Sequence, residues 1–379
     1  SRLHADHFPI GLRKIVDSTL RIEVTLVGGN ALPKLQIGSN YREKVTSYDL
    51  HEGINSISVS DAGDLYLTFS GSNPSSGNQV KVDAISGFTK IPMYVLGKTT
   101  NQEWKTMLAA SDAPNAILMG EDAYIACSRE KAVEFQDKNQ DSVLKSIDRI
   151  IAVEHKISGI SKNATDSRHR WWDGKLMIAE KASGLREAKD PGLVLYPTSY
   201  FHEILDPSKH SWGLFHEVGH HHQLGALNFP PVWEVQVNIY SLAAAWDRNP
   251  TYNTVQIKWT AVEKYLALPL EDRNYIANST GGTIRLALYY QLWKYFGDEF
   301  YPTLHRLIRE EQPKAPANTG NIDGRMQVLM VYASKASGRN LSDFFKKWGF
   351  KVPESYYEAV AGLNLPAPDQ DVTTIRSAE

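Results

Sequence analysis

The hydrophobic pattern of this chain changes its period near residue 97, and that change limits the folds that the chain can adopt. Before this point, short runs rich in Val, Ile, Thr and Tyr alternate apolar with polar residues, and turn clusters separate the runs. Several short alternating strands at this spacing favour an all-β sandwich. The runs expected to form strands are residues 20–27, 54–60, 64–70, 78–85 and 92–97.

From Lys98 onwards the apolar residues recur three and four positions apart, which is the period of amphipathic helices. Residues 171–180 and 192–199 read as strands, and beyond Ser211 the chain is mainly helical. The expected helices span residues 100–111, 129–158, 211–224, 233–246, 259–268, 283–296, 299–310, 341–350 and 353–365. We therefore expect the α+β class, with a β-sandwich over residues 1–97, a mostly helical domain over 98–367 and a polar tail over 368–379.

Composition and charge exclude several classes of function. A net charge of -2 without a lysine- or arginine-rich run argues against nucleic-acid partners and against a membrane surface. No apolar stretch approaches the roughly 20 residues that a transmembrane helix needs. Cys127 is the only cysteine, so the chain has no internal disulfide framework. We expect a monomer of two domains without a transmembrane segment.

The sequence His216-Glu217-Val-Gly-His220 carries the chemistry. Two histidines four positions apart on a helix project from one face, where both imidazoles can share a tetrahedral zinc ion. Glu217 follows the first ligand and can reach the metal-bound water without being a ligand itself. Zinc lowers the pKa of that water towards roughly 7, and the carboxylate takes its proton as it attacks a carbonyl. The alternative is a solvated helix with incidental histidines, but the surrounding helix is apolar.

A third protein ligand is expected on the next helix. Glu234 lies among Trp233, Val235 and other apolar residues, and the turn before it lets this helix cross back towards the metal. Two histidines and a glutamate leave one position open for water, as in catalytic zinc sites. Asn238 lies one turn further on the same face and is the candidate to accept a hydrogen bond from a ligand histidine. The competing interpretation of Glu234 is a surface carboxylate.

Other candidate residues have weaker support. Tyr289 and Tyr290 could supply the donor for the oxyanion that forms on the attacked carbonyl, although aromatic residues at helical spacing are more often core. Trp171 and Trp172 form a candidate edge for binding sugar or peptide, with core packing as the alternative. His221 and His222 cannot both face a metal that His220 already binds, and His222 is a candidate substrate contact.

The two helices together carry a longer pattern, W-G-x-x-H-E-x-G-H-x-x-Q followed after a spacer by E-V-x-x-N-I-Y-S. This pattern resembles that of the enhancin-like, mucin-degrading zinc metallopeptidases, and further similarity extends over nearly the whole chain. The matching residues are Trp212, Gly213, His216, Glu217, Gly219, His220, Gln223, Glu234, Val235, Asn238, Ile239, Tyr240 and Ser241.

The resemblance implies a β-sandwich followed by a zincin-like catalytic domain of the gluzincin type, with Zn²⁺ as cofactor. It implies a secreted or cell-surface enzyme, whose signal peptide would precede Ser1, acting on glycoproteins such as mucins with contacts to their glycans. One departure concerns the substrate. Family members often carry a G-Y-P-I-M-like stretch upstream of the metal helix, where this chain has GLVLYPTSYFHEI over residues 192–204, so the contacts at the substrate edge can differ.

Two alternatives from other classes stand beside the zinc endopeptidase. One is a non-catalytic module that binds glycoproteins or mediates adhesion, although a degenerate relative would usually have lost one of His216, Glu217, His220 and Glu234. The other is a zinc amidase or deacetylase with the same ligands.

Overall fold

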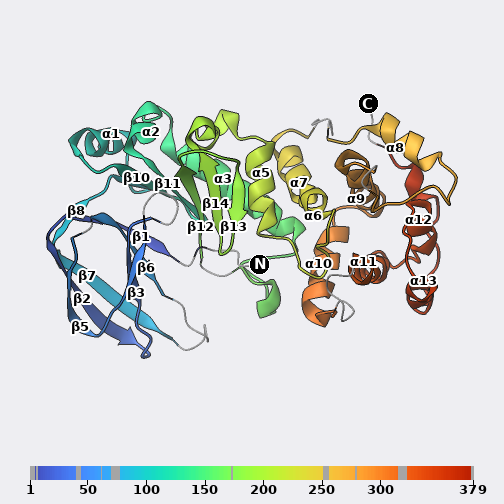
Figure 1. Ribbon diagram of the computed structural model, residues 1–379, viewed down its shortest axis with the longest axis horizontal. Coiled ribbons are helices and arrows are strands. Elements are labelled where there is room, and N and C mark those ends of the chain that lie inside the picture. The colour runs from blue at the N-terminus through green and yellow to red at the C-terminus, as the bar shows by residue number, and fades with distance from the viewer. Residues whose placement is uncertain are drawn as a thin grey trace. The chain divides into compact units, whose positions relative to one another are not determined.

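The computed structural model describes residues 5, 7–39, 44–60, 62–69, 77–171, 174–250, 256–277, 280–314 and 322–376. The chain divides into two compact units. One comprises Arg2–Arg149 and Gly174–Glu217, and the other comprises Ile150–Asp173 and Val218–Glu379 together with Ser1. β-Sheets occupy the first unit and helices predominate in the second (Figure 1), so the α+β class is confirmed. The domain limits expected from the sequence stay a prediction.

Two sheets form the predicted β-sandwich. One has five strands in the order β4 (Thr46–Asp49), β3 (Lys34–Ile37), β6 (Gly63–Thr68), β1 (Phe8–Lys14) and β8 (Phe88–Lys90). The other has three strands in the order β5 (Gly53–Ser58), β2 (Thr19–Gly28) and β7 (Gln79–Ser86).

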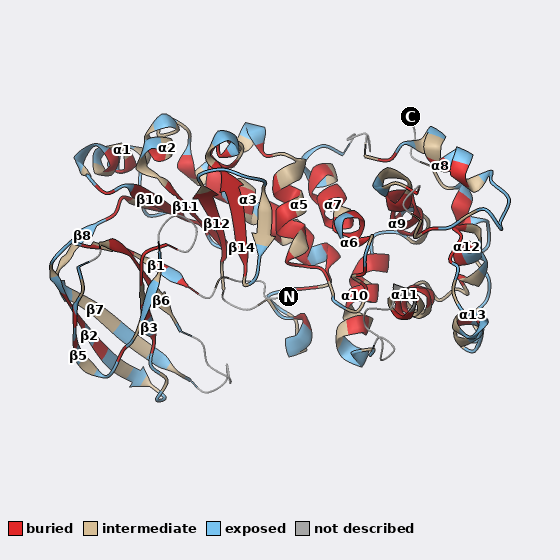
Figure 2. Cartoon of the chain, in the orientation of Figure 1, coloured by how far each residue is buried: buried red, intermediate tan, exposed pale blue. Residues whose placement is uncertain are grey.

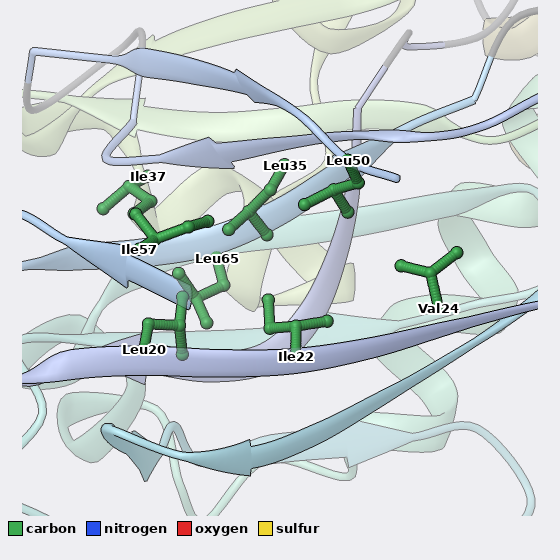
Figure 3. Packing of buried hydrophobic residues seen from close by; sticks show 8 residues of the cluster. All are labelled: Leu20, Ile22, Val24, Leu35, Ile37, Leu50, Ile57 and Leu65. Atoms are coloured by element: carbon green, nitrogen blue, oxygen red, sulfur yellow. The ribbon is translucent and has the colours of Figure 1, made fainter. Parts of the chain in front are cut away.

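Alternation along the strands builds the core of the sandwich. Leu20, Ile22 and Val24 of β2 are buried and their neighbours along the strand are exposed. Their side chains meet those of β3, β5 and β6 (Figure 3). Each fully buried aliphatic side chain contributes about 1.5–3 kcal/mol relative to an exposed one, so period-two alternation fixes which face of the strand lies inside.

A third sheet of six strands lies in the same unit. Its order is β13 (Glu187–Lys189), β14 (Leu193–Pro197), β12 (Leu176–Lys181), β11 (Ala123–Ser128), β10 (Asn115–Met119) and β9 (Met93–Val95). β10 and β14 are buried along their whole length (Figure 2). β9 lies in the run expected to be the last strand of the sandwich, but it pairs in parallel with β10.

Helices flank this sheet in the chain. They are α1 (Asn101–Ala110), α2 (Arg129–Glu134), α3 (Gln140–Ile157), α4 (His202–Leu205) and α5 (Trp212–His220). A capping box of Thr100 and Glu103 starts α1. The single helix expected over 129–158 is divided into α2 and α3, because the Asn139 side chain accepts a hydrogen bond from the backbone of Ser142 and starts a new helix.

The remaining helices belong to the second unit. They are α6 (Trp233–Gln236), α7 (Asn238–Arg248), α8 (Trp259–Leu266), α9 (Gly282–Phe296), α10 (Phe300–Glu311), α11 (Ile322–Ser337), α12 (Ser342–Lys347) and α13 (Glu354–Ala361). α9 is buried from Arg285 to Trp293, as a helix that is apolar on all sides must be. Among the described residues, no helix is both long enough and apolar enough to cross a membrane.

Candidate metal centre

The predicted ligands lie together at the end of α5. His216, His220 and Glu234 offer ligand atoms that all lie within 4.8 Å of one another. Both histidines come from one unbroken helix and are one turn apart, so their spacing follows from helix geometry. Glu234 comes from the first turn of α6, and its Oε2 lies 3.5 Å from Nε2 of His220. Two imidazoles and a carboxylate are the protein ligands of many catalytic zinc sites.

The general base expected from the sequence lies beside these ligands in the chain. Glu217 follows His216 and is only 8% exposed. The side chain of Tyr196, on β14, is buried and interacts electrostatically with the carboxylate of Glu217. Burial raises the pKa of the Tyr196 hydroxyl well above its ordinary value, and the carboxylates of Glu203 and Glu217 add to the increase while the Arg186 guanidinium opposes it. Tyr196 therefore stays protonated beside the candidate base.

His220 is held by a residue to which the sequence assigned no role. Nδ1 of His220 lies 2.8 Å from Oε1 of Gln223. The same side chain donates a hydrogen bond from Nε2 to the carbonyl oxygen of Trp233, at 2.7 Å. Asn238, the residue expected to support a ligand histidine, donates its amide to the carbonyl oxygen of Glu234 at 3.1 Å. The motif contains Gln223, but residue type alone does not indicate which amide reaches the ligand.

Gly219 lets α7 approach the metal helix closely, as a small residue at this position predicts. A Cβ at Gly219 would lie 3.0 Å from Cγ2 of Val237 and 3.1 Å from Cβ of Tyr240. The hydroxyl of Tyr240 donates to the backbone carbonyl of His222, just beyond α5, at 3.0 Å. Close packing and this hydrogen bond together fix the end of α5 that carries His220.

A family model described as peptidase M60, enhancin and enhancin-like matches residues 87–349, which is more than half of the chain. The chain belongs to this family. The resemblance inferred from the two-helix pattern is thereby confirmed, and membership supports the assignment as a metallopeptidase.

Individual relatives extend this comparison. TRPM8 channel-associated factor 3 of Mus musculus is 25% identical over 360 residues, which cover 86% of this chain and 35% of that protein. The chain spans about a third of the length of the curated relatives that it matches first.

Solved structures share the fold. A conserved protein of unknown function from Bacillus anthracis is 28% identical, with a TM-score of 0.86 over 98% of this chain and 76% of that chain. A metallopeptidase solved in complex with Tn antigen is 19% identical, with a TM-score of 0.81 over 100% of this chain and 76% of that chain. At that identity the second likeness shows the fold alone.

The tyrosines considered as oxyanion donors lie in the core of this M60 chain. Tyr289 is 0% exposed, and Tyr290 is 4% exposed with its ring edge-on to Trp246 and Trp259. Burial raises the pKa of the Tyr289 hydroxyl above its ordinary value. These are the contacts of core residues, and the catalytic role expected of either tyrosine stays a prediction.

Trp171, one of the two candidate tryptophans, packs against other side chains of the second unit. Trp171 is half-buried, and its ring lies against that of His155 with 3.8 Å between centroids. Nζ of Lys162 lies 4.5 Å from the centre of the Trp171 ring. Trp172 lies outside the described residues. The Trp171 ring is therefore packed against both His155 and Lys162, and its role in binding substrate stays a prediction.

His222 lies inside the second unit, away from solvent, and its role as a substrate contact stays a prediction. Its side chain is 0% exposed. Nδ1 lies 3.2 Å from the carbonyl oxygen of Val218 and 3.4 Å from a carboxylate oxygen of Glu154, and Nε2 lies 3.0 Å from Nδ1 of His155. Burial lowers the pKa of His222 well below its ordinary value and raises that of Glu154. The imidazole is therefore neutral and belongs to the core.

A second group of potential ligands consists of Asp166, His169 and Glu310. Nε2 of His169 lies 2.8 Å from Oε1 of Glu310. Arg168 binds both carboxylate oxygens of Asp166, at 2.6–3.0 Å, and holds the pKa of Asp166 at about 2. Because a guanidinium already neutralises Asp166, this group is an ion-pair cluster and a poor site for a cation.

Proposed function

We propose that this chain is a zinc-dependent endopeptidase that hydrolyses peptide bonds in glycoproteins such as mucins. The observation that carries the proposal is the grouping of His216, His220 and Glu234 within 4.8 Å, with Glu217 directly beside the first ligand in the sequence. Membership of the M60 peptidase family supports the same chemistry.

The donor set fits zinc. Imidazole nitrogens and a carboxylate are ligands that zinc accepts at about 2.0–2.2 Å, and three protein ligands leave room for water or substrate. Nδ1 of His220 is hydrogen-bonded to Gln223, which leaves Nε2 as the nitrogen that can bind a metal. That nitrogen is the one that faces Glu234. His216, His220 and Glu234 would therefore hold the ion.

Zinc in such a site supplies Lewis acidity, which makes water nucleophilic near neutral pH and polarises the substrate carbonyl. Glu217 would accept the proton that water loses as it attacks the peptide carbonyl carbon. The same carboxyl group would then give this proton to the amine leaving group as the C–N bond breaks. With 8% exposure, the carboxylate is largely shielded from bulk solvent.

Glycoproteins are the proposed substrates, and the proposed location is outside the cell or on its surface. The support is the fold shared with a metallopeptidase that was solved with Tn antigen, together with the half-buried aromatic ring of Trp171. Aromatic faces are suited to the apolar side of a sugar ring, so glycan contacts are part of the proposal.

The proposal is tested with a Glu217→Ala protein and a mucin-type glycopeptide. The variant should bind zinc as the wild type does, and cleavage should fall by a factor of about 10²–10⁴, the usual contribution of a general base. Mass spectrometry of glycosylated and deglycosylated substrate would map the new peptide termini. Undiminished cleavage by the variant would refute the mechanism.

A binding module without catalysis is the second candidate, because the name of the mouse relative states an association with a channel and no enzymatic activity. It predicts glycoprotein binding that survives Glu217→Ala and no new termini with either protein. A zinc amidase or deacetylase would instead give products that have lost acetyl mass with their peptide chain intact.

A further inference from the structure

Gln223 links the two helices that carry the candidate ligands. It lies three residues beyond His220 and is 7% exposed. Oε1 lies 2.8 Å from Nδ1 of His220, and Nε2 lies 2.7 Å from the carbonyl oxygen of Trp233. Trp233 is the first residue of α6 and directly precedes Glu234. One amide group thus contacts a ligand on α5 and the backbone beside a ligand on α6.

Hydrogen-bond chemistry fixes the direction of both contacts. A backbone carbonyl oxygen can only accept, so the end of the amide that faces Trp233 must be the NH₂ group. The end that faces His220 is then the amide oxygen, which can only accept, and Nδ1 of His220 must carry the proton. In a neutral imidazole this leaves the lone pair on Nε2. Nε2 is the atom that lies 3.5 Å from Oε2 of Glu234.

We propose that Gln223 is a positioning residue of the metal centre, a role that rests on the proposed zinc-dependent function. Its oxygen selects the tautomer in which Nε2 of His220 can bind the metal, and its NH₂ group fixes the backbone next to Glu234. The side chain thereby sets the orientation of one ligand and the position of another. Loss of a supporting contact of this kind commonly weakens metal binding by about 10–100-fold.

Two substitutions separate these two contacts. Gln223→Met has a similar length but removes both hydrogen bonds. Gln223→Glu keeps an acceptor for Nδ1 of His220, but a carboxylate cannot donate to the carbonyl oxygen of Trp233 and places a negative charge against it. If tautomer selection dominates zinc affinity, Gln223→Glu should retain most of the affinity that Gln223→Met loses.

Gln291 provides a matched control. It is also a buried glutamine whose amide bridges two segments, since Nε2 donates to the carbonyl oxygen of Thr373 at 2.8 Å and Oε1 accepts from Nε1 of Trp348 at 3.0 Å. Both partners lie outside the candidate metal centre. Gln291→Met therefore reproduces the loss of a bridging amide and its effect on stability, without the contact to His220.

The experiment measures zinc dissociation constants by competition with a chromophoric chelator for the wild type, Gln223→Met, Gln223→Glu and Gln291→Met. We expect Gln223→Met to weaken zinc binding by about 10–100-fold and Gln291→Met to leave it unchanged. In the zinc-free proteins, ¹H–¹⁵N correlations of the histidine rings should show His220 protonated at Nδ1 in the wild type and as a mixture of tautomers in Gln223→Met.

Equal zinc affinity of Gln223→Met and the wild type would overturn this proposal alone. So would an equal loss in Gln291→Met, because the effect would then reflect general stability. A wild type that binds no zinc would overturn the proposed function and this role with it. The tautomer measurement does not depend on how tightly the variants bind metal, and an unchanged His220 tautomer in Gln223→Met would refute the selection step.

Discussion

Nε2 of His220 lies 3.5 Å from Oε2 of Glu234, although the two residues belong to different helices. The side chain of Glu234 is 61% exposed and that of His220 is 21% exposed. Even with the imidazole protonated, a contact this exposed would stabilise a fold by only about 0–1 kcal/mol. The contact therefore adds little to the stability of the fold. A metal ion bound by both side chains would explain why they lie together.

Replacement of Glu234 by Gln is expected to weaken zinc binding by more than the roughly 10–100-fold that loss of a supporting residue causes. The amide keeps the size of the side chain but removes the charged ligand. Thermal stability of the zinc-free protein should change little, because the side chain is exposed. Chelator competition measures the first quantity and thermal unfolding the second.

Glu310→Gln is the matched control for this prediction, since Glu310 also lies beside a histidine in a group of potential ligands. We expect zinc affinity to stay at the wild-type value, because the Arg168 guanidinium already occupies the carboxylate of Asp166. Loss of zinc in Glu310→Gln but not in Glu234→Gln would show that the group of Asp166, His169 and Glu310 binds the metal instead.

The grouping of the ligands was predictable because helix spacing places His216 and His220 together, and the connection over residues 221–232 returns Glu234 to them. The partner of His220 was not predictable. Asn238 and Gln223 are both amides within reach of the motif, and only the tertiary structure shows Gln223 against Nδ1. The burial of His222 was not predictable either, because its partners Glu154 and His155 come from α3, which is distant in the sequence.

Of the sandwich strands, the sequence predicted β2, β5, β6 and β7 and missed β1, β3, β4 and β8. It also missed β10 and β11 of the third sheet. Both faces of these strands are covered, so residues such as Ile117 and Leu118 are buried in succession and period-two alternation disappears. α11 was missed as well. Its buried residues include adjacent Val328, Leu329 and Met330, which do not form a stripe with helical period.

Gly219→Val is expected to destabilise the protein by about 1–3 kcal/mol, the usual cost of overpacking. The new side chain would meet Cγ2 of Val237 and Cβ of Tyr240 at or below 3.1 Å. Gly225→Val is the control, because a Cβ there meets nothing within 4 Å. Thermal or urea unfolding of both variants measures the difference. Equal stability of the two variants would show that α7 does not limit the space at Gly219.

The second unit is expected to lose stability as the pH falls below about 6.5, the ordinary pKa of histidine. Burial lowers the pKa of His305 to about 3 and that of His155 to about 4. Between these values and about 6.5 the unfolded chain binds a proton that the folded chain does not, so falling pH favours unfolding. Each histidine contributes about 1.4 kcal/mol per pH unit in that window.

His305→Gln isolates one of these contributions. Burial raises the pKa of Glu154, so this carboxyl group opposes the histidines above pH about 4.5, and the comparison with the wild type cancels its effect. Urea unfolding between pH 7 and pH 4.5 should show a shallower dependence for His305→Gln. His51→Gln, at an exposed position, should follow the wild type. A parallel curve for His305→Gln would mean that His305 binds its proton equally well in the folded and the unfolded chain.

Trp171 and Trp246 are half-buried tryptophans that each carry a lysine ammonium over the ring, Lys162 at 4.5 Å and Lys294 at 3.9 Å. Only Trp171 is proposed to contact substrate. Trp171→Ala should raise KM for a glycosylated peptide by about 3- to 10-fold with kcat nearly unchanged, since an aromatic contact is worth about 0.5–1.5 kcal/mol. Trp246→Ala should lower thermal stability and leave KM at the wild-type value.

The measurement is steady-state cleavage of one peptide with and without its O-glycan. A higher KM for both peptides would indicate contact with the peptide, a higher KM for the glycosylated form alone would indicate contact with the sugar, and unchanged KM for both would leave Trp171 as a packing residue against His155.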